Sequence, residues 1–555
     1  MKKLLLFSAI FLFSCQPADN DFDVLIVGGR IIDGTGNPWF LADVGIHGDR
    51  ITAIGNLKGK RSKKTIDAAG KIVSPGFIDM LGQSELSLLV DNRAMSKISQ
   101  GVTTEVTGEG ESVAPLNDRT LKELRPFVEK YKVNIDWKNL EGYFRRLEEH
   151  KSAINLATFV GATQVREYVI GFDDRSPTPE ELDQMKRLVR DAMEQGALGV
   201  STSLVYAPAI YAKTQELIEL CKVAAEYGGI YCTHIRDERD NVTQSLYEAA
   251  DIAREAKLPV EVWHLKVAGK QNWEKMGDIA RLIDLQRKEG IDMTADIYPY
   301  TASATSLSAT IPAWVHDGGS AKLLERLKDP TIRKKIREEL EGNTKGQENF
   351  YRGTGPDGIM IGTVMNPELK QYEGKRLNEI AAAWKKHPLE TLFDFLLADS
   401  ARSGAIYFSM YEQDVRMAMA QPWVSFNTDY GEAALDGPLS EGKPHPRTFG
   451  TFARVLGKYV REEKILTLEE AIRKMTSLPA QRVGLKGRGL LKEGFFGDVV
   501  IFDPNTVSDK ATFEKPHQYS VGIHAVLVNG QPVWENGAFA GNLPGMVLRG
   551  PGWRK

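Results

Sequence analysis

The sequence predicts an α/β fold in which a (β/α)8 TIM-like barrel is flanked by two β-rich terminal segments. In the middle of the chain, strand patterns alternate with helix patterns roughly every 30 residues, and six or more such units favour a closed barrel over an open sheet. Both ends instead carry short β-type runs. The chain has 555 residues, and one α/β barrel commonly takes up about 250 residues or more. One large domain with appendages therefore fits the length.

Charge and composition argue against several classes of protein. The chain has 71 Lys and Arg against 74 Asp and Glu, a formal net charge of −3, which argues against a nucleic-acid-binding protein. Hydrophobic residues make up 42% and charged residues 26%, so disorder is excluded as the main state. The whole chain contains only nine histidines and three cysteines. These small numbers argue against a disulfide framework or an array of several zinc sites.

The first residues have the pattern of an export signal. A lysine pair at residues 2–3 precedes an apolar run at residues 4–13, and a small residue stands before Cys15. This run of about ten residues is too short to span a bilayer, which takes roughly 20. Residues 12–15 (LFSC) are similar to the bacterial lipobox, in which the cysteine is acylated. We expect residues 1–14 to be removed, Cys15 to be lipidated and the protein to lie in the bacterial cell envelope, periplasmic or anchored to a membrane. The alternative is a plain secretory signal.

Short β-type runs separated by turn residues occupy both ends of the remaining chain. They cover residues 23–29, 31–32, 43–47 and 50–54 at the N-terminal end, and residues 497–502, 524–528 and 532–534 at the C-terminal end. Asn529 and Gly530 lie between the last two runs and are typical of a tight turn. Runs of this kind predict small antiparallel sheets.

The middle of the chain predicts the strands and helices of the barrel in order. Thr178 as N-cap, Pro179 at the first helical position and Glu181 three residues after the cap predict the start of a helix. Further helices are expected at about residues 214–227, 243–257 and 273–288, and strands at about 196–201, 229–234, 260–266 and 291–298. A charged, helix-rich segment near residues 313–350 is interpreted as an insertion, and whether it forms a lid stays open. Strand-like runs resume at residues 358–364, 404–410 and 423–427.

Polar side chains stand where three of the predicted strands end, namely His234, His264 and Asp429. Active sites of α/β barrels lie at the carboxyl ends of the strands. Two imidazoles there can bind one Zn²⁺, and a nearby carboxylate can take a proton from the water that the metal activates. A single such histidine is more often a hydrogen-bonded core residue. Three polar strand ends at one edge, however, favour a metal-assisted hydrolase.

Several short motifs occur in a fixed order along the chain: residues 74–79 (SPGFID), 100–104 (QGVTT), 196–199 (GALG), 231–238 (YCTHIRDE), 264–266 (HLK), 295–300 (ADIYPY), 445–447 (HPR) and 476–480 (TSLPA). Through them the chain, from about residue 23 to its C-terminus, resembles the amidohydrolase superfamily and, within it, the N-acyl-D-amino-acid deacylase (D-aminoacylase) family. The resemblance implies a metal-dependent barrel at residues 74–484. It also implies that residues 23–73 and 485–555 pair into a small β-sandwich and that the protein hydrolyses an amide or a related bond.

The chain departs from the superfamily pattern at the first barrel strand. After the Gly-Phe-Ile-Asp run the superfamily usually carries His-x-His, whereas this chain has Leu81 and Gln83. Leucine has no donor atom, and an amide oxygen is a weak zinc ligand. We therefore expect a single tightly bound zinc ion rather than a binuclear centre.

The ligands of that single metal are implied by a second set of family positions. Two histidines of this set are matched by His234 and His264, but its cysteine has no counterpart in the GEGE stretch of this chain. Glu109 is favoured as the replacement because it lies nearer to the strand end, and two histidines with one glutamate form a sound zinc site. Glu111 and Cys232 are the alternatives. Cys232 would sit about 6.6 Å deeper in the barrel by strand rise and is interpreted as a packing residue.

Asp429 is the candidate general acid and base, which would accept a proton from the attacking water and deliver it to the leaving amine nitrogen. Its alternative role is that of a turn or N-cap aspartate. The resemblance implies a clamp for a substrate carboxylate, made of Tyr206, Lys266, Tyr298 and Arg447, with His445 as a further polar contact. Arginine suits this role because its guanidinium binds carboxylates bidentately.

These observations predict a zinc-dependent amidohydrolase that hydrolyses the amide bond of N-acyl-D-amino acids, with the D specificity implied by the resemblance alone. We expect it to bind a small-molecule substrate and no nucleic acid. We expect it to associate with a membrane only through a lipid anchor. A D-amino-acid dipeptidase or a cyclic-amide hydrolase on the same barrel is the alternative among enzymes. From another class, the missing His-x-His allows a non-catalytic barrel that binds ligands at the cell surface.

Overall fold

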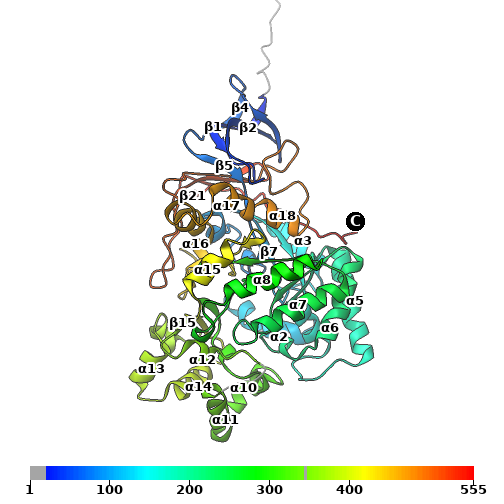
Figure 1. The fold of residues 1–555 in the computed structure, drawn as a ribbon, viewed down its shortest axis with the longest axis vertical. Coiled ribbons are helices and arrows are strands. Elements are labelled where there is room, and N and C mark those ends of the chain that lie inside the picture. Colours follow the sequence, from blue (N-terminus) through cyan, green and yellow to red (C-terminus); the bar gives the residue numbers. More distant parts are fainter. Residues whose placement is uncertain (1–19, 343–346, 555) are drawn as a thin grey trace, which may run out of the picture.

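The computed structural model describes residues 20–342 and 347–554, so the expected export signal and Cys15 lie outside the described residues. Figure 1 shows a β domain at one end of the long axis, the barrel in the middle and a helix-rich insertion at the other end. None of the helices in the described residues combines the length and the apolar composition that a membrane crossing requires.

The β domain is built from both ends of the chain. Its nine-stranded sheet runs in the order β21-β20-β19-β18-β5-β1-β2-β3, with β4 paired to β1. The strands are β1 (Phe22–Ile31), β2 (Phe40–His47), β3 (Arg50–Gly55), β4 (Ser62–Asp67), β5 (Ile72–Pro75), β18 (Val499–Phe502), β19 (Ile523–Val528), β20 (Gln531–Glu535) and β21 (Ala538–Phe539). β5 pairs antiparallel with β18, so that Val73 lies opposite Ile501. Val44 and Ile46 share one buried core with Val499, which confirms that the two termini form one domain.

The barrel is formed by parallel strands that close on one another. They are β6 (Phe77–Asp79), β7 (Val102–Thr107), β8 (Asn155–Thr158), β9 (Val160–Gly161), β10 (Gly199–Ser203), β11 (Ile230–His234), β12 (Val260–Val262), β13 (Met293–Ile297) and β17 (Val424–Phe426). β8 pairs with β7 and β9 pairs with β10, so these two are parts of one strand interrupted at Phe159. The Met80 amide donates to the Phe426 carbonyl at 3.3 Å and joins the first strand to the last. The predicted eight-stranded barrel is thereby confirmed.

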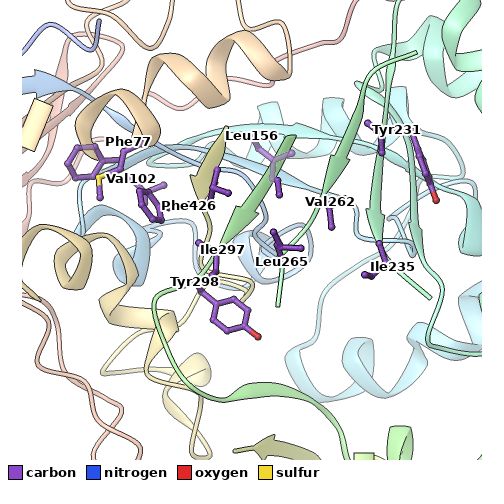
Figure 2. Packing of buried hydrophobic residues seen from close by; sticks show 14 of the residues in the cluster. Phe77, Val102, Leu156, Tyr231, Ile235, Val262, Leu265, Ile297, Tyr298 and Phe426 are labelled. Atoms are coloured by element: carbon purple, nitrogen blue, oxygen red, sulfur yellow. The ribbon is translucent and has the colours of Figure 1, made fainter. Parts of the chain in front are cut away.

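Apolar side chains of the barrel strands form the main core. Phe77, Val262 and Phe426 are fully buried, although they come from strands far apart in the sequence. Figure 2 shows these side chains together with Leu156 and Ile297 on neighbouring strands. Because a parallel sheet covered on its outer face buries both sides of each strand, polar residues such as Glu105 of β7 and Asp296 of β13 are enclosed together with the apolar ones.

The helices that cover the barrel begin and end close to their predicted positions. They are α5 (Pro179–Gln195), α6 (Thr214–Glu226), α7 (Val242–Ala256) and α8 (Met276–Lys288). At the start of α5 the Thr178 hydroxyl accepts from the Glu181 amide at 3.2 Å, and the Glu181 carboxylate accepts from the Thr178 amide at 2.8 Å. This reciprocal cap satisfies two backbone donors and fixes the first turn of the helix.

The insertion is larger than the sequence indicated. The runs at residues 358–364 and 404–410 are not barrel strands, because they form an antiparallel sheet of β14 (Ser303–Ser306), β16 (Gly404–Tyr407) and β15 (Ile359–Thr363). Around it lie α9 (Ala313–His316), α10 (Ser320–Arg326), α11 (Pro330–Glu341), α12 (Phe350–Thr354), α13 (Leu377–Trp384) and α14 (Pro388–Ala398). This part has its own apolar core, which takes in residues from Leu307 to Tyr407. A short apolar run does not reveal which neighbour it pairs with, so the predicted limits of 313–350 were too narrow.

Candidate metal centre

Three candidate ligands converge at the carboxyl ends of barrel strands. His234 is the last residue of β11, His264 follows β12 by two residues, and Glu109 follows β7 by two residues. Glu109 Oε1 lies 2.9 Å from His234 Nδ1 and 3.1 Å from His264 Nε2. One ligand atom from each of the three lies within 4.8 Å of the others. The structure therefore brings together the residues that the sequence favours as zinc ligands.

Two glycines hold Glu109 at this point. Gly108 and Gly110 have φ angles of 95° and 64°, in the left-handed region that disfavours residues with a Cβ atom. A Cβ atom on Gly110 would lie only 2.1 Å from Ser203 Oγ. The tight glycine loop thus allows the Glu109 carboxylate to reach both histidines.

Glu238 supports the two histidines from behind. Its Oε1 lies 3.0 Å from His264 Nδ1, and its Oε2 lies 3.6 Å from His234 Nε2, a buried atom without a hydrogen-bond partner. A carboxylate at the outer nitrogen of a ligating histidine orients the ring and raises its basicity. Glu238 was not among the residues predicted from the sequence, although its place four residues after His234 in the YCTHIRDE motif was an available signal.

The charges of the cluster suit a divalent cation. Burial alone would raise the pKa of Glu109, but hydrogen bonds with His234 and His264 hold this pKa well below its usual range. Burial and Lys266 would lower the pKa of His264, but the neighbouring carboxylates, above all Glu238, raise it to about 10. A protonated His264 thus balances part of the charge of these carboxylates, and a bound metal ion would displace its proton. Two histidines and one glutamate leave a fourth position open, as catalytic zinc requires.

Gln83 connects the ligand cluster to Asp429. Its side-chain Nε2 lies 2.9 Å from Glu109 Oε2 and 3.1 Å from Asp429 Oδ1. Leu81, the other residue in place of the usual His-x-His, is fully buried in an apolar cluster with Cys232 and cannot bind a metal. The bridging role of Gln83 escaped the sequence reasoning, which considered it only as a metal ligand.

Asp429 is held in an unusual conformation beside a guanidinium. Its φ angle is 45°, in the left-handed region, and such strain is concentrated at functional sites. Asp429 Oδ2 lies 2.6 Å from Arg447 Nη1. Burial raises the pKa of Asp429, and the attraction of Arg447 offsets this only in part. A carboxyl group with a raised pKa is suited to exchange protons near neutral pH.

In the predicted carboxylate clamp, the cations Arg447 and Lys266 are paired with carboxylates of the protein itself. Arg447 pairs with Asp429, and its guanidinium carbon lies 4.4 Å from the centre of the Tyr298 ring. The Lys266 ammonium contacts Glu238 and lies 2.7 Å from His264 Nδ1. A substrate carboxylate therefore has to share these cations with internal partners. Buried cations are stable only with such partners, which explains why the clamp is not free.

The remaining predicted residues have different surroundings. The Tyr206 ring lies 5.3 Å from the His234 ring, edge to face, at the mouth of the barrel. His445, expected as a substrate contact, is fully buried, and each ring nitrogen is 3.0 Å from a backbone partner, the Ala302 carbonyl and the Arg447 amide. Both ring nitrogens of His445 are thus engaged by backbone groups, and His445 borders the smaller cavity beside Arg447, so its role as a substrate contact stays a prediction.

The other two candidate metal ligands lie away from the cluster. Cys232 is fully buried in the apolar interior of the barrel with Trp263. Glu111 is exposed and contributes to the wall of a cavity next to the metal centre. In the described residues, the group able to hold a metal ion consists of Glu109 with the two histidines.

Two cavities meet at this centre. The larger has a volume of about 570 Å³ and is bordered by Glu109 and Tyr206, and the smaller, of about 260 Å³, is bordered by Asp429 and Arg447. Gln83 lines both of them. Glu109 and Asp429 therefore border neighbouring cavities that share Gln83, and the larger cavity has room for a small-molecule substrate.

Comparison with known proteins agrees with this geometry. A model of the amidohydrolase family matches residues 64–534. D-aminoacylase from Alcaligenes xylosoxydans xylosoxydans is 37% identical over 96% of this chain and 99% of its own length. N-acyl-D-glutamate deacylase from Bordetella bronchiseptica, solved with zinc and a phosphonate mimic of the tetrahedral intermediate, has a TM-score of 0.80 and 35% identity over 95% of this chain and 99% of its own. A third structure is that of a D-aminoacylase with a binuclear metal centre, in which one metal activates the enzyme and a second attenuates it. It has a TM-score of 0.79 and 36% identity over 95% of this chain and 100% of its own.

Proposed function

The chain belongs to the amidohydrolase family, and on this premise we propose that it hydrolyses the amide bond of N-acyl-D-amino acids. It is a metal-dependent hydrolase that acts on carbon–nitrogen bonds other than peptide bonds. The convergence of Glu109, His234 and His264 next to Asp429 is the observation that carries the proposal. Three relatives named D-aminoacylase, N-acyl-D-glutamate deacylase and N-acyl-D-aspartate deacylase support the D configuration.

A single zinc ion fits the donor set. Held by Glu109, His234 and His264, it would supply a Lewis acid that polarises the acyl carbonyl and acidifies water. A second metal would need ligands at Leu81 and Gln83, where the chain has an apolar side chain and an amide. The relative in which one metal activates and a second attenuates supports a mononuclear enzyme.

Asp429 carries the proton. Its ionised carboxylate takes a proton from the attacking water at Oδ1 or Oδ2 and then gives it to the leaving nitrogen. Gln83 donates to Oδ1, and the Arg447 guanidinium lies beside Oδ2, so both partners stabilise the ionised form that starts the reaction. Because Arg447 also lines the cleft, it binds the substrate carboxylate while remaining next to Asp429.

The test is metal analysis of the mature protein together with His234→Ala and Asp429→Asn variants, and hydrolysis of paired N-acetyl-D- and N-acetyl-L-amino acids. We expect about one zinc per chain and hydrolysis of D substrates, loss of both properties in His234→Ala, and loss of hydrolysis alone in Asp429→Asn. A metal-free wild-type protein that hydrolyses none of the panel would overturn the enzyme proposal in favour of a ligand-binding barrel. Hydrolysis of L substrates alone would overturn the proposed stereospecificity.

We also propose that the protein acts in the bacterial cell envelope, anchored by a lipid on Cys15. The charged, apolar and small-residue pattern of residues 1–14 supports this proposal. Cells that express the full chain should incorporate labelled palmitate into the protein, and a Cys15→Ser variant should not. Unlabelled wild-type protein in the soluble cytoplasmic fraction would contradict both the anchor and the location.

A further inference from the structure

Carboxylates dominate the wall of the larger cavity beside the metal centre. Six glutamates contribute to its lining: Glu85, Glu109, Glu111, Glu123, Glu167 and Glu348. Glu109 belongs to the metal centre, and Glu348 is neutralised by Arg239 at 2.6 Å. The described residues of the lining include no lysine or arginine, and burial lowers the pKa of His316, so that this histidine is neutral. Four glutamates therefore remain without a cation from the cavity wall.

Glu167 has an acceptor that the protein does not satisfy. Its side chain is only 3% exposed, and its Oε1 has no hydrogen-bond partner. Burial, together with the charges of Glu111 and Glu123, raises the pKa of Glu167 to about 8. A buried acceptor without a donor is destabilising, and a cation that enters the cavity would supply the missing donor.

The spacing of these carboxylates points to an organic cation rather than a metal ion. In the described residues, Glu109, His234 and His264 are the group whose ligand atoms gather around one point, and the four remaining glutamates are not part of such a group. A metal ion needs several oxygens around one centre. An ammonium or guanidinium group on a flexible chain instead donates to carboxylates spread along a wall.

The two cavities meet at the metal centre and differ in the ionisable groups that line them. Gln83 and Thr305 line both, whereas Arg447 lines the smaller cavity and Glu167 the larger. A substrate whose carboxylate is bound by Arg447 and whose amide lies at the metal therefore extends its other end into the acidic cavity. We propose that this cavity binds a cationic group of the substrate, so that the enzyme prefers N-acyl-D-amino acids with an ammonium or guanidinium on the side chain or on the acyl group. This inference rests on the proposed deacylase function and names its substrate class.

The experiment compares substrates that match in shape and differ in charge. Nα-acetyl-D-lysine and Nα-acetyl-D-norleucine place the difference on the side chain, and glycyl-D-leucine and propionyl-D-leucine place it on the acyl group. In at least one pair we expect kcat/KM to be about tenfold or more higher for the cationic member. A Glu123→Gln/Glu167→Gln variant should reduce this ratio to about one while its zinc content is unchanged.

The matched control removes two negative charges elsewhere. Glu129 is exposed on α2 (Asp118–Tyr131), the helix that carries Glu123, and Glu180 is exposed in the first turn of α5. Neither lines the cavity. A Glu129→Gln/Glu180→Gln variant should keep the wild-type ratio. An equal loss in both variants would show that net charge, rather than the cavity, sets the preference, and would overturn the inference.

A binding measurement separates this inference from the deacylase proposal. Isothermal titration of the zinc-loaded Asp429→Asn variant should show at least about tenfold tighter binding of the cationic member of the preferred pair. Equal binding in both pairs, or hydrolysis that favours the neutral members or N-acetyl-D-glutamate, would overturn the cationic preference and leave the deacylase function standing. Hydrolysis of no D substrate would overturn the deacylase function, and the titration would then decide the inference by itself.

Discussion

Replacing Gln83 by leucine removes the amide that connects Glu109 to Asp429. Gln83 Nε2 donates to the two carboxylates over 2.9 Å and 3.1 Å. A hydrogen bond to a charged group contributes about 1.5–3 kcal/mol, and because Gln83 is exposed to the cleft, we take that range for both bonds together. At 1.4 kcal/mol for each factor of ten, kcat/KM should fall by roughly 10- to 100-fold.

The same substitution should move the pH profile in a defined direction. The Gln83 amide stabilises the ionised form of Asp429, and burial already raises the pKa of this carboxyl group. Loss of the donor raises the pKa further. Because Asp429 must be ionised to accept the proton, the acidic limb of kcat/KM should move to higher pH.

The assay measures kcat/KM for an N-acetyl-D-amino acid from about pH 5 to 9, with zinc per chain determined for each preparation. The matched control is Gln371→Leu, since Gln371 is an exposed glutamine whose side-chain amide donates to the Glu368 carbonyl of its own segment. If Gln83→Leu retains zinc and keeps both its rate, within about twofold, and its acidic limb, the bridge has no part in catalysis and the reasoning is refuted.

Four further substitutions test the candidate metal centre, its supporting carboxylate and a buried ion pair of the barrel. Glu109→Gln should lower zinc affinity and abolish activity, whereas Glu111→Gln should keep about one zinc per chain, as measured by metal analysis. Glu238→Gln should weaken zinc binding by about 10- to 100-fold in a chelator competition, because His264 loses the carboxylate that orients it. Lys97→Met should lower the free energy of unfolding by about 3–5 kcal/mol in urea titrations, because the buried Lys97 ammonium lies 3.0 Å from Asp79 Oδ2.

For each of these substitutions, one result would contradict the expected effect. Full zinc binding in Glu109→Gln with loss in Glu111→Gln would exchange the roles of the two glutamates. Unchanged chelator competition in Glu238→Gln would show that the histidine rings are fixed by other contacts. For the buried lysine the control is Lys63→Met, since Lys63 pairs with Asp23 at the surface, where solvent screens the pair, and its replacement should leave the free energy of unfolding nearly unchanged. Equal destabilisation of the two variants would contradict the argument from burial.

The barrel and the two candidate histidine ligands could be predicted from the sequence because both depend on local patterns. Repeated apolar strands followed by capped helices determine the parallel barrel, as the Thr178 cap of α5 shows. The strand ends then mark the catalytic edge, so His234 and His264 could be identified as neighbours although they lie on different strands. Glu109 was favoured over Glu111 and Cys232 through the resemblance to the family, whose cysteine ligand has no counterpart in this chain.

What the sequence could not predict depends on contacts across the cleft. Gln83 was recognised as a poor ligand, but its hydrogen bonds with Glu109 and Asp429 join residues from three separate segments. In the same way, the pairing of Arg447 with Asp429 and the backbone contacts of His445 arise from tertiary packing. No periodicity or spacing in the chain records such contacts, since each involves a loop whose path is set by the rest of the fold.

The pairing of β5 with β18 has a consequence for the order of folding. β5 lies in the first part of the chain and β18 near its end, so the edge of β5 stays open during synthesis until almost the whole chain has emerged. An open strand edge is a template for aggregation, and contacts between such distant segments form slowly. The nascent chain therefore benefits from a chaperone that covers this edge, and loss of the last strands should leave an insoluble protein even though the barrel sequence is complete.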